Sequence, residues 1–108
     1  MGYQFAIKLD QIAEETMTRL VLDTQPILLV HHQAQIYAIQ DACPHMGASL
    51  AKGTLSEGRV VCPKHKAQID VKTGRIVSKA KVLFLKLPTK AAKVYPVKIE
   101  DGKIFVEV

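Results

Sequence analysis

Two short motifs in this sequence bring together residue types that bind soft metal ions. The first reads Cys43-Pro44-His45 and the second Cys62-Pro63-Lys64-His65, with sixteen residues between His45 and Cys62. Each motif offers one thiolate and one imidazole from a turn that proline stiffens. These ligands suit zinc or an iron–sulfur cluster, whereas magnesium and calcium prefer oxygen ligands. Cys43, His45, Cys62 and His65 are therefore the candidate ligands of one metal centre.

Two kinds of metal centre are compatible with this ligand set. A [2Fe–2S] cluster takes four protein ligands, two on each iron, and a mixed Cys₂His₂ set satisfies it. A single zinc ion also takes four ligands, but zinc fingers usually pair cysteine with cysteine and histidine with histidine. In the zinc alternative the site staples a binding module whose basic half binds an acidic partner. His31 and His32 end an apolar segment and are expected at the surface or in hydrogen bonds.

The net charge of +5 is spread unevenly along the 108 residues. Residues 1–50 carry two basic and five acidic side chains, and residues 51–108 carry thirteen basic and five acidic ones. Such an excess either attracts an acidic partner or forms a solvated basic face. Aromatic residues make up only 6% of the chain, so a platform for stacking nucleic-acid bases is not predicted.

Length and composition predict one globular domain spanning residues 1–108. The sequence has no apolar stretch of membrane-spanning length, and its first residues do not resemble a signal peptide. We therefore expect a cytoplasmic protein, where two cysteines are metal ligands more often than a disulfide. Because we find neither a nucleophile beside a general base nor a phosphate-binding loop, no enzymatic activity is predicted. We expect a monomer.

The apolar periodicity around the motifs is that of short strands, which indicates an all-β protein. The expected strands are Tyr3–Lys8, Thr16–Leu22, Pro26–His32, Gln35–Ile39, Arg59–Cys62, Ala67–Val71, Arg75–Val77, Val94–Glu100 and Lys103–Val108. Gln33-Ala34 and Asp101-Gly102 predict hairpin turns, whereas Ala42–Gly58 is predicted to be an irregular loop. The predicted fold is an antiparallel β-sandwich base with a small cluster-binding subdomain over about 42–77.

Over nearly its whole length the chain resembles the Rieske ferredoxin family. The family's Cys-x-His and Cys-x-x-His motifs occur here with the family's spacing, and the similarity continues in the residues around them. The matching stretches are Met46–Leu55, Val60-Val61, Asp70, Thr73-Gly74 and Tyr95-Pro96-Val97. The resemblance implies the Rieske fold and one [2Fe–2S] cluster. In that family Cys43 and Cys62 would bind the inner iron, and His45 and His65 the outer iron near the surface.

The resemblance also implies a soluble one-electron carrier. The chain is similar to the ferredoxin component of aromatic-ring oxygenases and to the small subunit of assimilatory nitrite reductase. The implied partners are a reductase as donor and an oxygenase or reductase as acceptor, with an acidic docking face matching the basic half. Rieske centres span roughly −150 to +300 mV. Ala67 and Ile69 stand where high-potential members have a serine and a tyrosine, so we expect a low potential.

Several positions depart from the family pattern. Lys66 stands where a glycine is usual, so its side chain is expected to point outward. Together with Lys64 it flanks His65 and would place positive charge beside the outer iron. The segment from Gly74 to Tyr95 is longer than usual, so the loop that shields the cluster is expected to be rebuilt around Leu83–Ala92.

Overall fold

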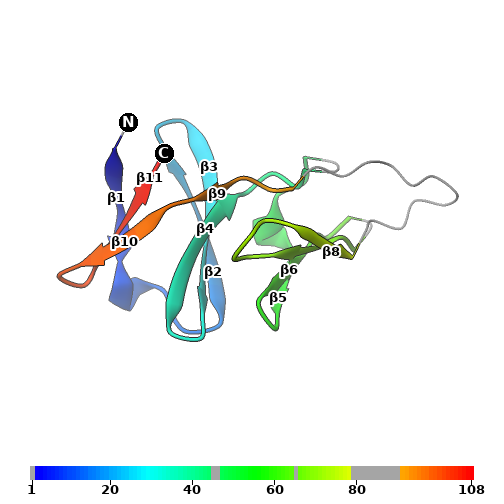
Figure 1. Ribbon diagram of the computed structural model, residues 1–108, viewed down its shortest axis with the longest axis horizontal. Coiled ribbons are helices and arrows are strands. Elements are labelled where there is room, and N and C mark those ends of the chain that lie inside the picture. The colour runs from blue at the N-terminus through cyan, green and yellow to red at the C-terminus, as the bar shows by residue number, and fades with distance from the viewer. Residues whose placement is uncertain (1, 45–46, 65, 79–90) are drawn as a thin grey trace, which may run out of the picture.

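The described residues form short strands in three antiparallel sheets (Figure 1). The fold is seen in a computed structural model, which describes residues 2–44, 47–64, 66–78 and 91–108. The strands are β1 (Tyr3–Lys8), β2 (Thr16–Leu22), β3 (Gln25–His32), β4 (Gln35–Gln40), β5 (Thr54–Ser56), β6 (Arg59–Val61), β7 (Gln68–Asp70), β8 (Ile76–Ser78), β9 (Val94–Tyr95), β10 (Val97–Glu100) and β11 (Lys103–Glu107). Within these ranges two 3₁₀ helices join the strands, η1 (Leu9–Gln11) and η2 (Leu50–Lys52). The predicted all-β antiparallel fold class is confirmed.

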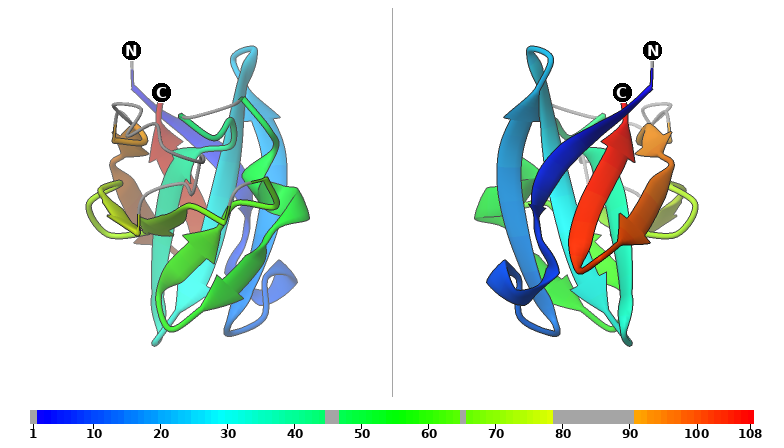
Figure 2. Two further views of the ribbon diagram at one scale, coloured as in Figure 1. Left: turned by 90° about the vertical axis from the view of Figure 1, so that its right-hand side faces the viewer. Right: turned by 90° about the vertical axis from the view of Figure 1, so that its left-hand side faces the viewer.

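Two of the sheets stack to form the part of the molecule that we call the base. The first sheet has the strand order β1-β11-β10 and the second β2-β3-β4-β9. Figure 2 shows the first sheet lying across the second. Because β1 pairs with β11, the two ends of the chain lie side by side. The core between the sheets includes Ile27, Leu29, Ile104 and Val106, which are fully buried.

Strand β3 is buried on both faces, which explains its continuous apolar sequence. Ile27 and Leu29 point into the core of the base, while Leu28 and Val30 point into a second core on the other side. All four side chains are 0% exposed. A strand with one face in solvent would instead alternate between apolar and polar residues.

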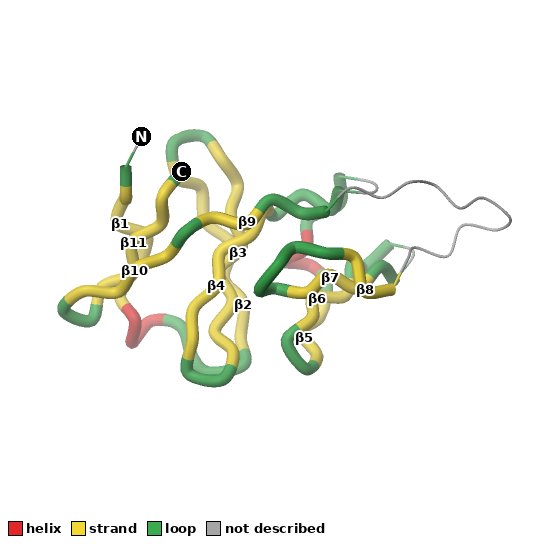
Figure 3. The backbone as a smooth tube through the Cα atoms, viewed as in Figure 1, coloured by secondary structure: helices red, strands yellow, loops and turns green. Residues whose placement is uncertain are grey.

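The third sheet, β5-β6-β7-β8, covers the second core at one end of the long axis (Figures 1 and 3). The prediction of an irregular loop over Ala42–Gly58 was wrong in part, because the segment contains η2 and strand β5. Glu57 and Gly58 form the β5–β6 turn, with φ of +51° and +78°. Such two-residue turns match the twist of a hairpin. Strand β5 contains a single apolar residue, Leu55, and lies between Gly53 and Gly58, so its sequence resembles that of a loop.

The predicted strand Val94–Glu100 is also wrong as a single element, because it breaks at Pro96. Strand β9 pairs with β4 in the second sheet, and β10 pairs with β11 in the first. Proline has no N–H for a ladder, so it suits the point where the chain changes sheets. Its carbonyl accepts a 3.0 Å hydrogen bond from the Glu107 N–H.

The segment between the third sheet and the base is described only from residue 91 onward. The predicted rebuilt loop Leu83–Ala92 therefore lies almost entirely outside the described residues. Ala92 is buried, and its N–H donates to the Gly74 carbonyl at 2.7 Å. In the parts of the chain that are described, no helix has the length and apolar character to cross a membrane.

Candidate metal centre

The first ligand loop follows β4 and is closed by backbone hydrogen bonds. The Cys43 N–H donates to the Ala48 carbonyl at 2.7 Å, and the Gly47 N–H donates to the Cys43 carbonyl at 2.8 Å. Gly47 has φ +74°, a left-handed conformation that glycine adopts without strain. An antiparallel bridge between Ala42 and Ser49 joins the two sides of the loop. Cys43 is therefore fixed at the base of a closed turn.

The second ligand loop follows β6 and is closed in the same way. The Cys62 N–H donates to the Ala67 carbonyl at 2.7 Å, so in both loops the cysteine bonds to the fifth residue after it. Lys66 turns this loop with φ +59° and is exposed, which confirms that its side chain points outward. Lys64 is exposed as well.

The two loops bring the cysteine thiols together in the second core. Cys43 is 2% exposed and Cys62 is 0% exposed, and neither forms a disulfide. Burial raises the pKa of the Cys62 thiol, its hydrogen bond with Cys43 raises it further, and the Lys64 backbone N–H lowers it. Metal binding removes such protons, because the thiolate is the ligand. Two adjacent buried thiols fit one iron of a [2Fe–2S] cluster.

The two predicted histidine ligands, His45 and His65, lie outside the described residues. The structure thus brings together Cys43 and Cys62, while the histidine half of the ligand set stays a prediction. Within residues 2–44, 47–64, 66–78 and 91–108, no group of three His, Cys, Asp or Glu side chains could hold a metal ion.

The other two histidines are occupied by hydrogen bonds, as predicted. His31 Nδ1 lies 2.8 Å from the Ile12 carbonyl oxygen, and His32 Nδ1 lies 2.8 Å from Glu15 Oε1. His32 is only 9% exposed, so it is a buried structural residue at the end of β3. The carboxylate of Glu15 also accepts the Gln33 N–H at 3.0 Å, which ties the segment before β2 to the β3–β4 turn.

Asp41 anchors the first ligand loop and was missed by the sequence analysis. It is 3% exposed at the end of β4, and its Oδ2 lies 3.1 Å from Arg19 Nε on β2. Its Oδ1 accepts the Ala51 N–H at 3.0 Å, and its carbonyl accepts the Leu50 N–H at 2.7 Å. The chain leaving the loop is thereby held against the base. An aspartate before a loop gives no sequence signal, since its partner lies on another strand.

The surroundings of the second loop are apolar and tightly packed. Ala67 and Ile69 are 0% exposed and share the second core with both cysteines. Neither side chain can donate a hydrogen bond. Gly53 packs so closely on the Val61 carbonyl that a Cβ would have no room there. This contact joins the end of η2 to the residue before Cys62.

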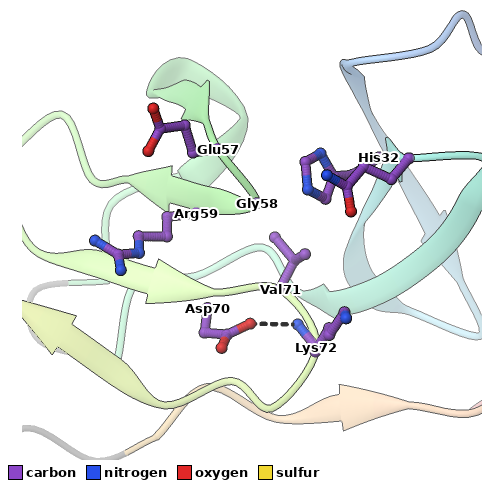
Figure 4. Close-up of a pocket in the computed structure, with 8 residues that line it drawn as sticks. His32, Glu57, Gly58, Arg59, Asp70, Val71 and Lys72 are labelled. Carbon is purple, nitrogen blue, oxygen red and sulfur yellow. Dashed lines mark hydrogen bonds between the residues drawn. The ribbon is translucent and has the colours of Figure 1, made fainter.

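A polar pocket of about 300 Å³ lies between the base and the third sheet, away from the cysteines (Figure 4). The base contributes His32 and Gln33 to it. The third sheet contributes Glu57, Gly58, Arg59, Asp70, Val71 and Lys72. The Asp70 carboxylate accepts the Lys72 N–H at 2.8 Å, so the acidic group is engaged in its own turn. The pocket marks the junction of the two parts.

Paired loops with buried thiols on a small all-β scaffold are compatible with an iron–sulfur protein. The sequence pattern of the Rieske [2Fe-2S] domain matches residues 2–86. This chain belongs to the Rieske [2Fe–2S] family.

Two proteins that are similar to this chain over most of its length are ferredoxin subunits. The anthranilate 1,2-dioxygenase ferredoxin subunit of Burkholderia cepacia is 31% identical over 100 residues, which are 93% of this chain and 86% of that protein. The 3-phenylpropionate/cinnamic acid dioxygenase ferredoxin subunit of Photorhabdus laumondii is 36% identical over 92 residues, which are 83% and 80% of the two chains.

A solved structure supports the same assignment. The complex of reduced oxygenase and oxidized ferredoxin in carbazole 1,9a-dioxygenase contains a chain that superposes with a TM-score of 0.83 at 26% identity, covering 96% of this chain and 100% of that one. The protein accordingly carries one [2Fe–2S] cluster and transfers electrons without catalysing a reaction itself. The zinc-stapled alternative finds no support in these comparisons.

Proposed function

We propose that this chain is the ferredoxin component of an oxygenase system. It accepts one electron from a reductase and delivers it to an oxygenase or reductase partner. The ferredoxin subunits to which it is similar belong to dioxygenases, which favours an oxygenase as the acceptor. The observation that carries the proposal is the pair of identically closed loops that bury Cys43 and Cys62 against each other.

In this proposal Cys43, His45, Cys62 and His65 hold the cluster. When bound, the cluster takes up and releases a single electron at these ligands. The two cysteines lie inside the second core, where the packing of Leu50, Val60 and Ile69 excludes water from the thiolates. The neighbours of His65 in the sequence, Lys64 and Lys66, are exposed. We assign the histidines to the iron nearer the surface, which shortens the path to a docked partner.

The residues around the second loop set the expected potential. Hydrogen bonds to the cluster raise its reduction potential. Ala67 and Ile69 have no hydroxyl to offer, so we expect a value toward the lower end of the range of roughly −150 to +300 mV for Rieske centres. A midpoint potential near the upper end would contradict this role for the two apolar residues.

We further propose that residues 1–108 form one domain, in which about 42–77 make up the cluster-binding subdomain. Both cysteine loops and nearly all of the third sheet fall in that range. A cytoplasmic location is supported by the cysteine content, because both cysteines are used in the site and none remains for a disulfide. We expect a monomer, which sedimentation velocity of the loaded protein tests.

Electron paramagnetic resonance of anaerobically purified, dithionite-reduced protein tests the proposed function. We expect a rhombic signal with a low average g value and two irons per chain. The single variants Cys43→Ser, His45→Ala, Cys62→Ser and His65→Ala should each lose this signal. His31→Gln is the matched control. His31 is a histidine of the base that forms a hydrogen bond with the Ile12 carbonyl, so its replacement should leave the signal unchanged. One zinc per chain without iron would refute the proposal.

A further inference from the structure

Charge is segregated along the long axis of the molecule. Residues 42–78 carry six basic and two acidic side chains, a net charge of +4. Residues 2–41 and 91–108 carry five basic and eight acidic side chains, a net charge of −3. The segment 79–90 adds four lysines to the sequence but lies outside the described residues.

The two charged regions lie at opposite ends of an elongated molecule. Figure 1 shows the third sheet near one end of the long axis and the β10–β11 turn at the other, where Glu100 and Asp101 are exposed. The Debye length at physiological ionic strength is about 8 Å, so a partner that meets one end is screened from the charges of the other.

The basic side chains of the cluster-binding end are exposed and free of ion pairs. They are Lys52, Arg59, Lys64, Lys66, Lys72 and Arg75. All ten acidic residues of the chain lie in its described part, and none of them lies within salt-bridge distance of these six. In the base, by contrast, Arg19 is paired with Asp41 and Lys98 with Glu100. Arg59 and Lys72 line the polar pocket beside the base, whereas Lys64 and Lys66 belong to the second ligand loop, where their positive charge is available to a binding partner.

Lys64 and Lys66 are the basic residues closest in sequence to a proposed ligand, since they flank His65. Lys66 occupies a left-handed backbone position, with φ +59°, that a glycine would adopt without strain. Strain of this kind is often retained where a side chain has a function. An exposed lysine at this position places a charge beside the second ligand loop.

We propose that the cluster-binding end, centred on Lys64 and Lys66, is a docking face for an acidic surface of a partner protein. This inference rests on the proposed electron-carrier function and adds the chemistry of the partner. Opposite charges accelerate encounter and orient the partners, and the effect decreases with ionic strength. With the base negative, an acidic surface is drawn to the cluster end and repelled from the far end, which favours a productive orientation.

The test measures how fast small charged oxidants react with the reduced, loaded protein. The anionic probe is iron(III)–EDTA and the cationic probe is tris(phenanthroline)cobalt(III), mixed in a stopped-flow instrument. The rate is compared at about 0.01 M and about 1 M salt, where the Debye length is about 30 Å and 3 Å. We expect the rate with the anion to fall severalfold as salt rises, and the rate with the cation to rise.

Two double variants with the same change in net charge locate the effect. Lys64→Gln with Lys66→Gln should lower the rate with the anion severalfold at low salt. Lys98→Gln with Lys103→Gln, on β10 and β11 of the base, should leave it within about twofold. Equal effects of the two pairs, or the same salt dependence for both probes, would overturn the inference.

Recording the resonance signal on the same samples separates this inference from the proposed function. A chain without the cluster signal refutes the electron-carrier function and the docking face with it. A loaded chain with a flat salt profile refutes the docking face alone. Binding of the loaded protein to duplex DNA that persists at about 0.15 M salt would assign the basic face to nucleic acid and also overturn the inference.

Discussion

Lys66 shows how a single residue in a ligand loop can keep a conformation that its type disfavours. Its φ of +59° lies in the left-handed region, where a side chain other than glycine costs about 1–2 kcal/mol. The loop accepts this cost because the closing bond from Cys62 to Ala67 requires the turn.

Replacing Lys66 by glycine should therefore stabilise the loaded protein. We expect a gain of about 0.5–1 kcal/mol, because the relief of backbone strain exceeds the extra entropy of the unfolded chain. This corresponds to a rise of about 2–8 °C in the thermal midpoint measured by circular dichroism. Lys64→Gly is the control, since it removes the same charge at a residue with negative φ and should lower the midpoint. Equal shifts for both variants would contradict this view.

Glu15 links stability to pH through His32. The hydrogen bond with the His32 ring, followed by that from the Gln33 N–H, holds the pKa of the Glu15 carboxyl below its ordinary value of 4.5. The folded state thus favours the carboxylate over the acid. The stabilisation is complete above the ordinary pKa and is lost as the pH falls below 4.5 through the lowered pKa.

Glu15→Gln should remove this part of the acid sensitivity. At neutral pH the variant is expected to be less stable than the parent, and the difference should shrink as the pH falls below 4.5. Thermal unfolding across an acid pH series measures it. Glu57→Gln serves as the control, because the exposed Glu57 carboxylate has no hydrogen-bond partner among the described residues. A difference that stays constant with pH would contradict the linkage.

At the scale of elements, the position of the first ligand loop depends on Asp41. Its carboxylate forms an ion pair with Arg19 on β2 and accepts a hydrogen bond from the Ala51 N–H in η2. The Asp41 side chain is 4% exposed. Removing a buried acceptor leaves its donors unsatisfied, which costs more than the hydrogen bond itself contributes. Without this carboxylate, η2 and strand β2 would no longer be connected through one side chain.

Asp41→Ala should accordingly destabilise the protein by about 2–3 kcal/mol and speed the loss of the cluster. Asp41→Asn keeps an acceptor for the Ala51 N–H and removes only the charge. Its loss of unfolding free energy should therefore be roughly half that of Asp41→Ala. Bleaching of the visible absorption at constant temperature follows cluster loss, and denaturant titration follows stability. An unchanged bleaching rate in Asp41→Ala would show that the loop is held without this side chain.

The elements that could be predicted from the sequence are those with a clear period or turn signal. Strand β3 and its hairpin with β4 follow from the apolar run and the Gln33-Ala34 turn, and the proximity of Cys43 and Cys62 follows from the spacing of the two motifs, while the histidine ligands stay a prediction. Strand β5 was missed because its sequence, Thr54-Leu55-Ser56, has one apolar residue and lies between two glycines, which indicate a loop. The break at Pro96 was missed because one apolar pattern continues across two sheets. The Asp41–Arg19 pair depends on strand pairing that a single sequence does not contain.

At the scale of the whole molecule, the third sheet meets the base at the ring of His32. The β5–β6 turn lies against this ring, and the polar pocket opens beside it (Figure 4). A Cβ added to Gly58 would lie 2.9 Å from His32 Nε2, closer than ordinary packing allows. The absence of a side chain at residue 58 therefore sets how closely the two parts approach.

Gly58→Ala should weaken this junction by more than its backbone strain alone. Gly58 has φ +78° and Gly102 has φ +71°, but a Cβ at Gly102 would meet no atom within 4 Å. Gly102→Ala thus reports the backbone cost, about 1 kcal/mol, and Gly58→Ala should cost about 1–2 kcal/mol more because the His32 ring must move. In a His32→Ala background, the additional destabilisation by Gly58→Ala should disappear. A double-mutant cycle measures this difference as a coupling energy. If Gly58→Ala and Gly102→Ala destabilised the parent protein equally, the β5–β6 turn would be free to move away from the base. The His32 ring would then not set the spacing between the cluster-binding end and the base.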